Sequence, residues 1–210
     1  MLYTCAMSAD AVSAVLALAE QWRAKVSSDL AHRIVAYLGL LLKWNERVNL
    51  TGAQSLGELI SDHLPDSFVL AGLCPMGASV VDVGSGGGLP ALPLAILRTD
   101  CRIGLIEPRA KRVAFLRTAV REVGCVGVEV FHGRLDDFPG AGFGVAVSRA
   151  TFGPEAWLPM ARPLLASGGI AVVLAAARIH ARAPAVQLME EREYVTGNGA
   201  PRWCGSFCYT

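Results

Sequence analysis

A glycine-rich turn lies near the middle of the chain, directly after a short apolar run. Residues 79–83 are rich in valine, which is typical of a strand buried on both faces of a parallel sheet. Asp82 belongs to this run, and Gly84, Gly86 and Gly88 follow it at alternate positions. Glycine lets the backbone turn sharply and lets a ligand approach atoms that a Cβ would shield. The stretch therefore predicts a ligand bound where the strand ends.

The spacing of the glycines decides which ligand is expected. A dinucleotide fingerprint, G-x-G-x-x-G, needs a third glycine where this chain has Leu89. The spacing G-x-G-x-G, with Asp82 two residues ahead, is instead the pattern of methyltransferases that use S-adenosylmethionine. Asp82 could pair with the ammonium of that cofactor, and Glu107, where the next strand-like run ends, could accept hydrogen bonds from the ribose hydroxyls. The alternative is an ordinary glycine-rich connection without a ligand, because a single glycine motif is weak.

The loop after a third expected strand, over residues 126–131, would lie beside the adenine. There the backbone of Leu135 could donate to a ring nitrogen, and Asp136 could accept from the exocyclic amine. Arg149 follows a fourth expected strand at the same edge of the sheet. The predicted cofactor-binding residues are Asp82, Gly84, Ser85, Gly86, Gly88, Leu89, Glu107, Leu135, Asp136 and Arg149.

Arg149 is also the residue expected to face a substrate. A guanidinium is always protonated, so it is unsuited to act as a base and well suited to hold an anion or a carboxylate. The alternative is a structural arginine that pairs with an acid such as Asp66. Because the chain has neither a D/N-P-P-[YFW] element nor a cysteine nucleophile at this point, we assign no catalytic acid or base.

A basic helix is expected over residues 109–123. It carries Arg109, Arg112, Arg117 and Arg121 toward one broad face, which suits either phosphate contact or a solvated amphipathic surface. The two interpretations are equally open from the sequence.

These residues must be positioned by two kinds of structure. Residues 1–77 show helical patterns, and residues 78–210 alternate strand and helix, so we expect a helical segment packed on a Rossmann-like α/β core with a mostly parallel sheet. The first helix is expected from Ser8 or Asp10 to Val26, with a second helix capped by Ser28. A third helix begins after Ser55, and Pro65 should end it or kink the chain into a fourth.

Composition limits the remaining choices. The chain has 210 residues, 53% of them hydrophobic, and a net charge of +1, so it suits one globular unit without an overall basic field. The six cysteines form no C-x-x-C pair, which argues against a metal site and for reduced thiols in a cytoplasmic protein. The apolar run over 168–177 is too short to span a membrane. We expect a monomer.

Six short motifs in order along the chain resemble those of the bacterial 16S ribosomal RNA guanine-N7 methyltransferases, also called the glucose-inhibited division protein B family. The resemblance covers roughly residues 40–175, and six matches in the right order are specific where any one is weak. The motifs are Trp44 and Asn45 with Asn49, Leu50 and Thr51; His63 with Asp66 and Ser67; residues 82–90; Lys111 and Arg112 with Phe115 and Leu116; Gly133 and Arg134 with Asp136; and Ser148, Arg149 and Ala150.

This resemblance implies a function. It implies a seven-stranded Rossmann-like core, S-adenosylmethionine as methyl donor, and a guanine of 16S ribosomal RNA, naked or in the small subunit, as acceptor. Guanine nitrogen-7 carries a lone pair and no proton, so the transfer needs no general base. The residues expected to contact the RNA are Asn49, Lys111, Arg112, Arg134 and Arg149.

Two departures from the family pattern concern the active edge. Ala91 stands where the family usually has glycine, and Ala175 replaces a lysine after the fifth strand. Two other functions stay open: a methyltransferase acting on a small molecule, and a ribosomal RNA binding protein without catalysis.

Overall fold

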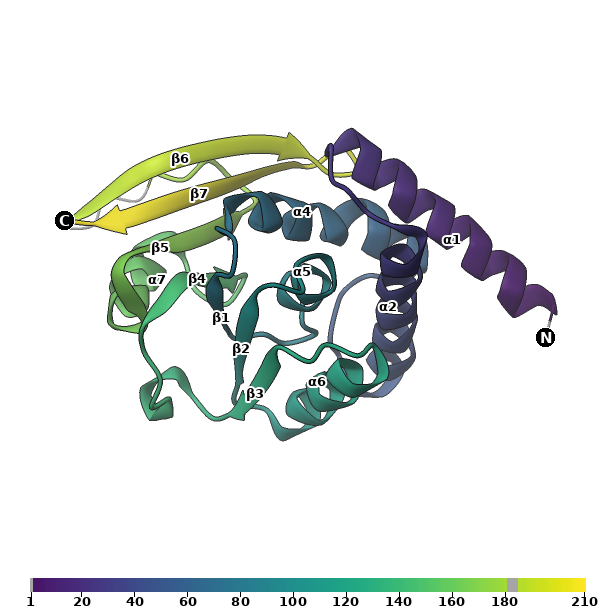
Figure 1. The fold of residues 1–210 in the computed structure, drawn as a ribbon, viewed down its shortest axis with the longest axis horizontal. Helices are drawn as coiled ribbons and strands as arrows, with labels where there is room; N and C mark the ends of the chain where they lie inside the picture. Colours follow the sequence, from purple (N-terminus) through teal and green to yellow (C-terminus); the bar gives the residue numbers. More distant parts are fainter. Residues whose placement is uncertain (1, 181–184) are drawn as a thin grey trace.

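The computed structural model describes residues 2–180 and 185–210, and its centre is one seven-stranded sheet in the order β3-β2-β1-β4-β5-β7-β6 (Figure 1). Strands β1 to β5 are parallel to one another, whereas β7 pairs antiparallel with both β5 and β6. This confirms the predicted α/β fold with a mostly parallel sheet. The strands are β1 (Ser79–Val83), β2 (Arg102–Glu107), β3 (Val128–His132), β4 (Phe143–Arg149), β5 (Leu165–Ala175), β6 (Val186–Val195) and β7 (Pro201–Tyr209).

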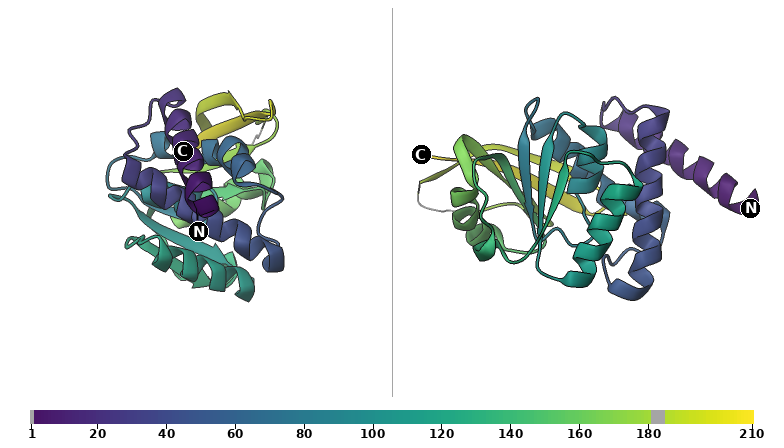
Figure 2. Two further views of the ribbon diagram at one scale, coloured as in Figure 1. Left: turned by 90° about the vertical axis from the view of Figure 1, so that its right-hand side faces the viewer. Right: turned by 60° about the horizontal axis from the view of Figure 1, so that its bottom comes forward.

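Most of the helices cover one face of this sheet, and α7 covers part of the other (Figure 1). The regular helices are α1 (Leu2–Gln21), α2 (Ser28–Val48), α3 (Leu56–Glu58), α4 (Leu64–Leu73), α5 (Ala91–Leu97), α6 (Ala110–Glu122) and α7 (Pro154–Ala161). The right-hand view in Figure 2 shows α1 extending past the rest of the helical layer. Of the helices within the described residues, none has the length and apolar character needed to cross a membrane.

The boundaries of the first helices differ from those predicted. The first helix, α1, begins at Leu2 and ends at Gln21, so it starts earlier and stops earlier than the expected span ending at Val26. Ser27, not Ser28, caps α2, and its side chain accepts a hydrogen bond from the Leu30 amide. One turn of π-helix, Leu59–His63, joins α3 to α4 where Pro65 was expected to disturb the chain.

The connection from β3 to β4 contains only a short 3-10 turn, η2 (Leu135–Asp137). A helix is the usual crossover between parallel strands, and it would cover the second face of the sheet. Phe131, Phe138 and Phe143 pack against one another there instead, with ring centroids 5.1 and 6.0 Å apart along the row.

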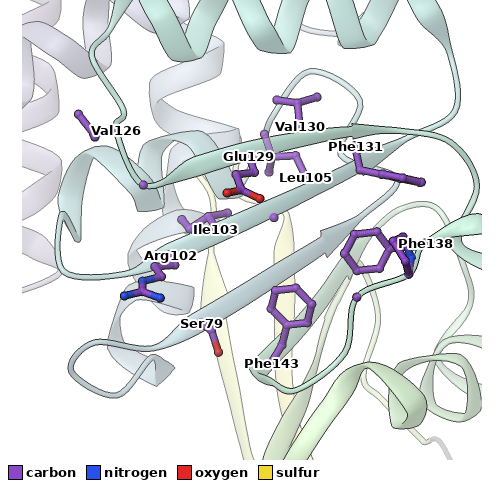
Figure 3. A pocket seen from close by; sticks show the side chains of 14 residues that line it. Ser79, Arg102, Ile103, Leu105, Val126, Glu129, Val130, Phe131, Phe138 and Phe143 are labelled. Carbon is purple, nitrogen blue, oxygen red and sulfur yellow. The ribbon is translucent and has the colours of Figure 1, made fainter.

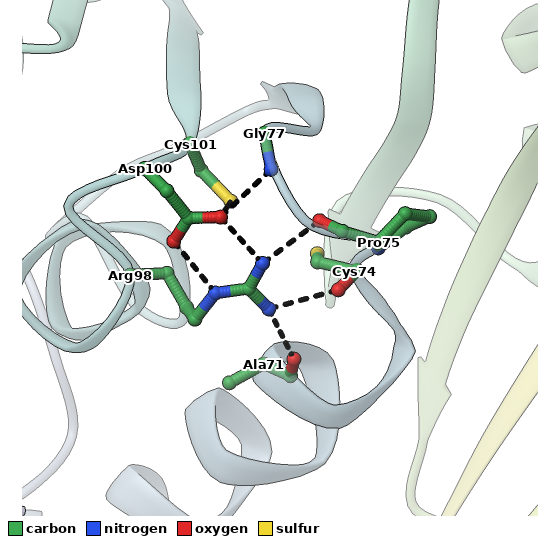
Figure 4. Close-up of polar contacts among 7 residues, drawn as sticks. All are labelled: Ala71, Cys74, Pro75, Gly77, Arg98, Asp100 and Cys101. Carbon is green, nitrogen blue, oxygen red and sulfur yellow. Dashed lines mark hydrogen bonds and ion pairs between the residues drawn. The ribbon is translucent and has the colours of Figure 1, made fainter.

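A single arginine joins the end of α4 to the connection between α5 and β2 (Figure 4). The guanidinium of Arg98 donates to the carbonyl oxygens of Ala71, Cys74 and Pro75 at 2.8 to 3.0 Å. It also pairs with Asp100 at 2.8 Å, and this pair holds the pKa of the Asp100 carboxyl well below its usual range. Arg98 thereby supplies donors to carbonyls at and just beyond the end of α4.

Candidate functional site

The glycine-rich turn adopts a backbone that only glycine tolerates easily. Gly84, Gly86 and Gly88 have φ angles of +77°, +56° and +84°, in the left-handed region. A Cβ at Gly88 would also lie 2.6 Å from Cδ1 of Leu92. The turn leads from β1 into α5 and places its backbone at the carboxyl edge of the sheet, where ligands of this kind of fold bind.

The N-terminal helical segment holds this turn from behind. The hydroxyl of Tyr37 in α2 donates to the carbonyl of Gly87 at 2.6 Å. A Cβ at Gly87 would lie 3.0 Å from Cδ1 of Leu41 and 3.1 Å from the carbonyl oxygen of Leu50, so the turn and the end of α2 are closely packed. The Asn45 side chain closes that helix end by accepting from the amides of Leu50 and Thr51 at 2.6 and 2.9 Å.

Asp82 is a buried carboxyl without a complete set of partners. Asp82 is 1% exposed, and its Oδ2 has no hydrogen-bond partner among the described residues. Burial raises the pKa of Asp82 to about 7, while the hydroxyl of Ser85 and the charge of Arg149 act in the opposite direction. Removing a carboxylate from water is costly unless a cation or a donor compensates it. An ammonium group of a ligand would satisfy this oxygen, so Asp82 fits the cofactor predicted from the sequence.

Glu107 ends β2 and faces the glycine turn, as the sequence indicated. Its carboxylate accepts from the amide of Gly86 at Oε2 and from the amide of Arg109 at Oε1, each at 2.9 Å. A carboxylate has about four acceptor positions, so two remain for hydroxyl donors. Glu107 therefore fixes the geometry of the turn and retains the capacity expected for a ribose partner.

The loop expected beside the adenine corresponds to η2. Leu135 is half-buried and Asp136 is exposed. Both follow β3 at the carboxyl edge of the sheet, next to β2 and Glu107. Their contacts with an adenine stay a prediction.

Arg149 forms an ion pair with Asp66, as expected for the structural alternative to a substrate-binding arginine. Its Nη1 lies 3.1 Å from Oδ2 of Asp66 in α4, and its Nη2 contacts Nδ1 of His63. The same residue also lines a cavity of about 320 Å³ at the ends of β4 and β5, together with Arg202, Phe152 and Ala175. The ion pair is thus part of the wall of a pocket, and a binding role for Arg149 stays a prediction.

This pocket adjoins the glycine turn through the loop after β4. The hydroxyl of Thr151 lies 3.4 Å from the carbonyl oxygen of Gly84, and a Cβ at Gly84 would clash with the Thr151 side chain. Ala150 between Arg149 and Thr151 has a φ of +55°, which is uncommon for a residue other than glycine. The pocket wall and the predicted cofactor turn therefore share one tightly folded corner.

The residues expected to meet RNA lie around this edge with different exposures. Asn49, Lys111 and Arg134 are exposed, whereas Arg112 is half-buried and donates to the carbonyl of Asn49 at 3.1 Å. Arg112 thus ties α6 to the end of α2, in addition to any contact with phosphate. The exposed arginines of the α6 region are Arg109, Arg117 and Arg121.

Tyr194 is a site residue that the sequence did not indicate. Its buried hydroxyl donates to Oδ1 of Asp66 at 2.5 Å, across 128 positions of sequence. It lies in β6, in a stretch without a recognisable motif. His63, one of the motif residues, contacts Arg149 through Nδ1.

A second cavity lies elsewhere (Figure 3). It measures about 780 Å³ and opens over the second face of the sheet, between Phe131, Phe138 and Phe143 on one side and Arg102 on the other. Ser79 and Arg102, which begin their strands, line it. The cavity is therefore near the amino edge, away from the glycine turn, and follows from the missing crossover helix.

Several solved methyltransferases have the same fold. A SAM-dependent methyltransferase from Aquifex aeolicus superposes with a TM-score of 0.55 at 15% identity, over 73% of this chain and 93% of that one. TYW2 from P. horikoshii, solved in complex with MeSAdo, gives a TM-score of 0.54 at 16% identity, over 69% of this chain and 61% of that one. Sheet order, glycine turn and the buried Asp82 place the chain in the Rossmann-like fold class to which these methyltransferases belong.

Sequence relationships identify the family within that class. Residues 31–194 match the profile of rRNA small subunit methyltransferase G, so the chain belongs to this family. A ribosomal RNA small subunit methyltransferase G from Halorhodospira halophila is 35% identical over 160 residues, 76% of each chain. One from Chromohalobacter salexigens is 35% identical over 183 residues, 85% of this chain and 88% of the relative. The resemblance seen in the short motifs is confirmed.

Proposed function

We propose that this chain transfers a methyl group from S-adenosylmethionine to nitrogen-7 of a guanine in 16S ribosomal RNA. The observation that carries the proposal is the pocket of about 320 Å³ beside the glycine turn, with Arg149 and Arg202 in its wall. Its volume is at the lower end of the range for small-ligand sites, and a single base is a small ligand. The family also supports the proposal, because its members are named as small-subunit ribosomal RNA methyltransferases.

The cofactor side of the reaction would be held by residues already described. Asp82, the glycine turn and Glu107 would hold S-adenosylmethionine, which supplies an electrophilic methyl group when bound. Asp82 would face the ammonium, because its Oδ2 is buried and has no partner among the described residues. Glu107 would accept from hydroxyls while it keeps the turn closed through the Gly86 amide.

The acceptor side suits a nucleophile that loses no proton. Nitrogen-7 and O6 of guanine are both acceptors, so the attacking atom needs no base. In the pocket, Asp66 already accepts from Tyr194 and pairs with Arg149. Phe152, Val173 and Leu174 contribute apolar wall, which suits the faces of a base. The task left to the protein is orientation and exclusion of water.

The exposed cations of the α6 region and of the loop after β3 would bind the RNA backbone. Lys111 and Arg117 lie exposed on α6, Arg109 precedes that helix and Arg134 follows β3. Phosphate contacts of this kind hold an RNA without reading its sequence, and they weaken with salt. The net charge of only +1 means that such binding depends on this local group.

The test is transfer of labelled methyl groups to ribosomal RNA from a strain that lacks the endogenous enzyme. Small subunits and naked 16S RNA are incubated with the protein and labelled S-adenosylmethionine, and nitrogen-7 methylation is mapped by chain cleavage at the modified guanine. We expect one guanine of 16S RNA to be modified. Transfer to a metabolite extract but to no RNA would contradict the proposal and select a small-molecule methyltransferase.

A further inference from the structure

Asp66 and His63 contact the guanidinium of Arg149, and Tyr194 from a distant part of the chain supports Asp66. Asp66 in α4 is 3% exposed, and both of its oxygens are engaged. Oδ1 accepts from the hydroxyl of Tyr194 in β6, and Oδ2 lies 3.1 Å from Nη1 of Arg149 in β4. His63 contacts the other terminal nitrogen of the same guanidinium. The arginine is thereby held from two sides.

His63 and Tyr194 each take the form that this arrangement requires. Burial and the neighbouring charge of Arg149 lower the pKa of His63, so its ring is neutral and Nδ1 can accept from the guanidinium. Asp62 and Asp66 act in the opposite direction, and Arg202 in the same direction as Arg149. Burial raises the pKa of Tyr194, and the nearby Asp66 carboxylate raises it further. The phenol therefore stays protonated and donates a hydrogen bond to Asp66.

Arg149 has donor capacity left over. Its side chain is 20% exposed, and the buried Nη1 forms no well-aligned hydrogen bond with any described residue although Asp66 is close. The guanidinium also lines the pocket with Arg202. A guanidinium has five N–H donors, and two sides of this one are occupied by protein. Nη1 is buried beside Asp66, so a donor that meets a substrate must come from the exposed part of this side chain, which lines the pocket.

We infer that Asp66 is a positioning residue for methyl transfer, supported by Tyr194, and that it holds Arg149 with its free N–H donors toward the acceptor nucleotide. The inference rests on the proposed function and assigns roles to two residues that act through Arg149. A flexible arginine would sample many rotamers, whereas one fixed by Asp66 and His63 is already oriented before the RNA arrives. Orientation of this kind acts on the rate of the chemical step.

The experiment compares two tyrosines of the C-terminal hairpin. Tyr194→Phe removes only the hydroxyl that reaches Asp66 and keeps the ring, which packs edge-on against Trp22 with centroids 5.4 Å apart. Tyr209→Phe is the matched control, because its hydroxyl donates to the carbonyl of Leu158 and has no link to Arg149. Both variants lose one hydrogen bond between a phenol and the protein.

Three quantities are measured for the full-length proteins: the melting temperature, the affinity for S-adenosylhomocysteine by calorimetry, and the single-turnover rate of methyl transfer to 16S RNA at saturating cofactor and RNA. We expect Tyr194→Phe to lower the rate about tenfold, on the scale that misplacement of a positioned group costs, with cofactor affinity unchanged. Tyr209→Phe should lose comparable thermal stability and keep the wild-type rate. Asp66→Asn, which keeps the shape and removes the charge, should lower the rate further.

The outcomes separate the inference from the proposed function. If Tyr194→Phe and Tyr209→Phe both transfer methyl groups at the wild-type rate per folded molecule, the Asp66 network is structural and the inference is overturned. The proposed function stands in that case, because the wild-type protein modifies the RNA. If the wild-type protein transfers no methyl group to ribosomal RNA, both are overturned.

Discussion

Replacing Asp82 by asparagine should change stability and cofactor affinity in opposite directions. In the cofactor-free protein, burial raises the pKa of Asp82 to about 7, from an ordinary value of 3.8. Between these two values the folded protein binds a proton that the unfolded chain has released, so the free energy of unfolding falls as pH rises through this window. At 1.36 kcal/mol per pKa unit, the full loss is roughly 4 kcal/mol.

Asparagine has nearly the same shape and does not ionise, so Asp82→Asn lacks this loss. We expect the variant to match the wild type near pH 4 and to be more stable by as much as roughly 4 kcal/mol at about pH 8. The free energy of unfolding is measured by urea denaturation at several pH values. Glu122→Gln is the control, because Glu122 is an exposed carboxylate on α6 and its replacement should leave the pH dependence unchanged.

Cofactor binding should respond to Asp82→Asn in the opposite direction from stability. An ammonium beside Asp82 supplies the missing countercharge, so binding should lower the pKa of the carboxyl and release protons near pH 7. At a pH equal to the pKa, half of the cofactor-free molecules carry the proton on Asp82. Binding of S-adenosylhomocysteine at that pH should therefore release about half a proton per molecule bound. Asp82→Asn should weaken binding by about 1.5–3 kcal/mol, the scale for a hydrogen bond to a charged group.

Calorimetry in two buffers of different ionisation enthalpy measures the proton release directly. The wild type should show a buffer-dependent heat near pH 7, and Asp82→Asn should not. Equal pH dependence of stability in the two proteins, together with equal cofactor affinity, would refute the assignment of Asp82 as the buried partner of the ammonium.

Three further predictions concern the turn and its supports. Gly86→Asn should weaken S-adenosylhomocysteine binding while the protein stays folded, because asparagine tolerates a positive φ and a Cβ there meets no protein atom closer than 3.6 Å. Gly124→Asn is the matched control, since Gly124 has a φ of +67° and lies in open space. Equal affinity in the two variants would count against cofactor binding at the glycine turn. Glu107→Ala should cost about 1–3 kcal/mol of cofactor affinity in the same titration, and an unchanged affinity would show that ribose lies elsewhere. Arg98→Lys should lower the melting temperature, because an ammonium cannot reach three carbonyls and Asp100 together. A loss of cofactor affinity without a loss of stability would contradict a purely structural role for Arg98.

The parts of the site that the sequence predicted are those encoded within a few residues. The strand before the turn and the acid at the end of β2 follow from short valine- and isoleucine-rich runs, and parallel strands bring their carboxyl ends to one edge. Positive φ at Gly84, Gly86 and Gly88 likewise follows from local backbone geometry. These features needed no knowledge of how distant segments pack.

The parts that the sequence missed depend on distant contacts. The link from Tyr194 to Asp66 joins residues 128 positions apart, and no periodicity or motif in β6 signals it. The start of α1 at Leu2 was missed because the expected cap at Ser8 or Asp10 lies inside the helix. The ion pair of Arg149 was weighed as an alternative, but only the fold shows that one guanidinium can pair with Asp66 and still line the pocket.

The N-terminal helices take part in the site from behind the sheet edge. Tyr37 donates to the carbonyl of Gly87, Leu50 closes the space beside that glycine, and Asp66 holds Arg149. A glycine-rich turn is conformationally free on its own, so it must be ordered by contacts from elsewhere before it can present its backbone to a ligand. We therefore propose that residues 1–77 and the core over 78–210 form one catalytic unit. The helical segment orders the turn and the arginine that the core alone would leave mobile.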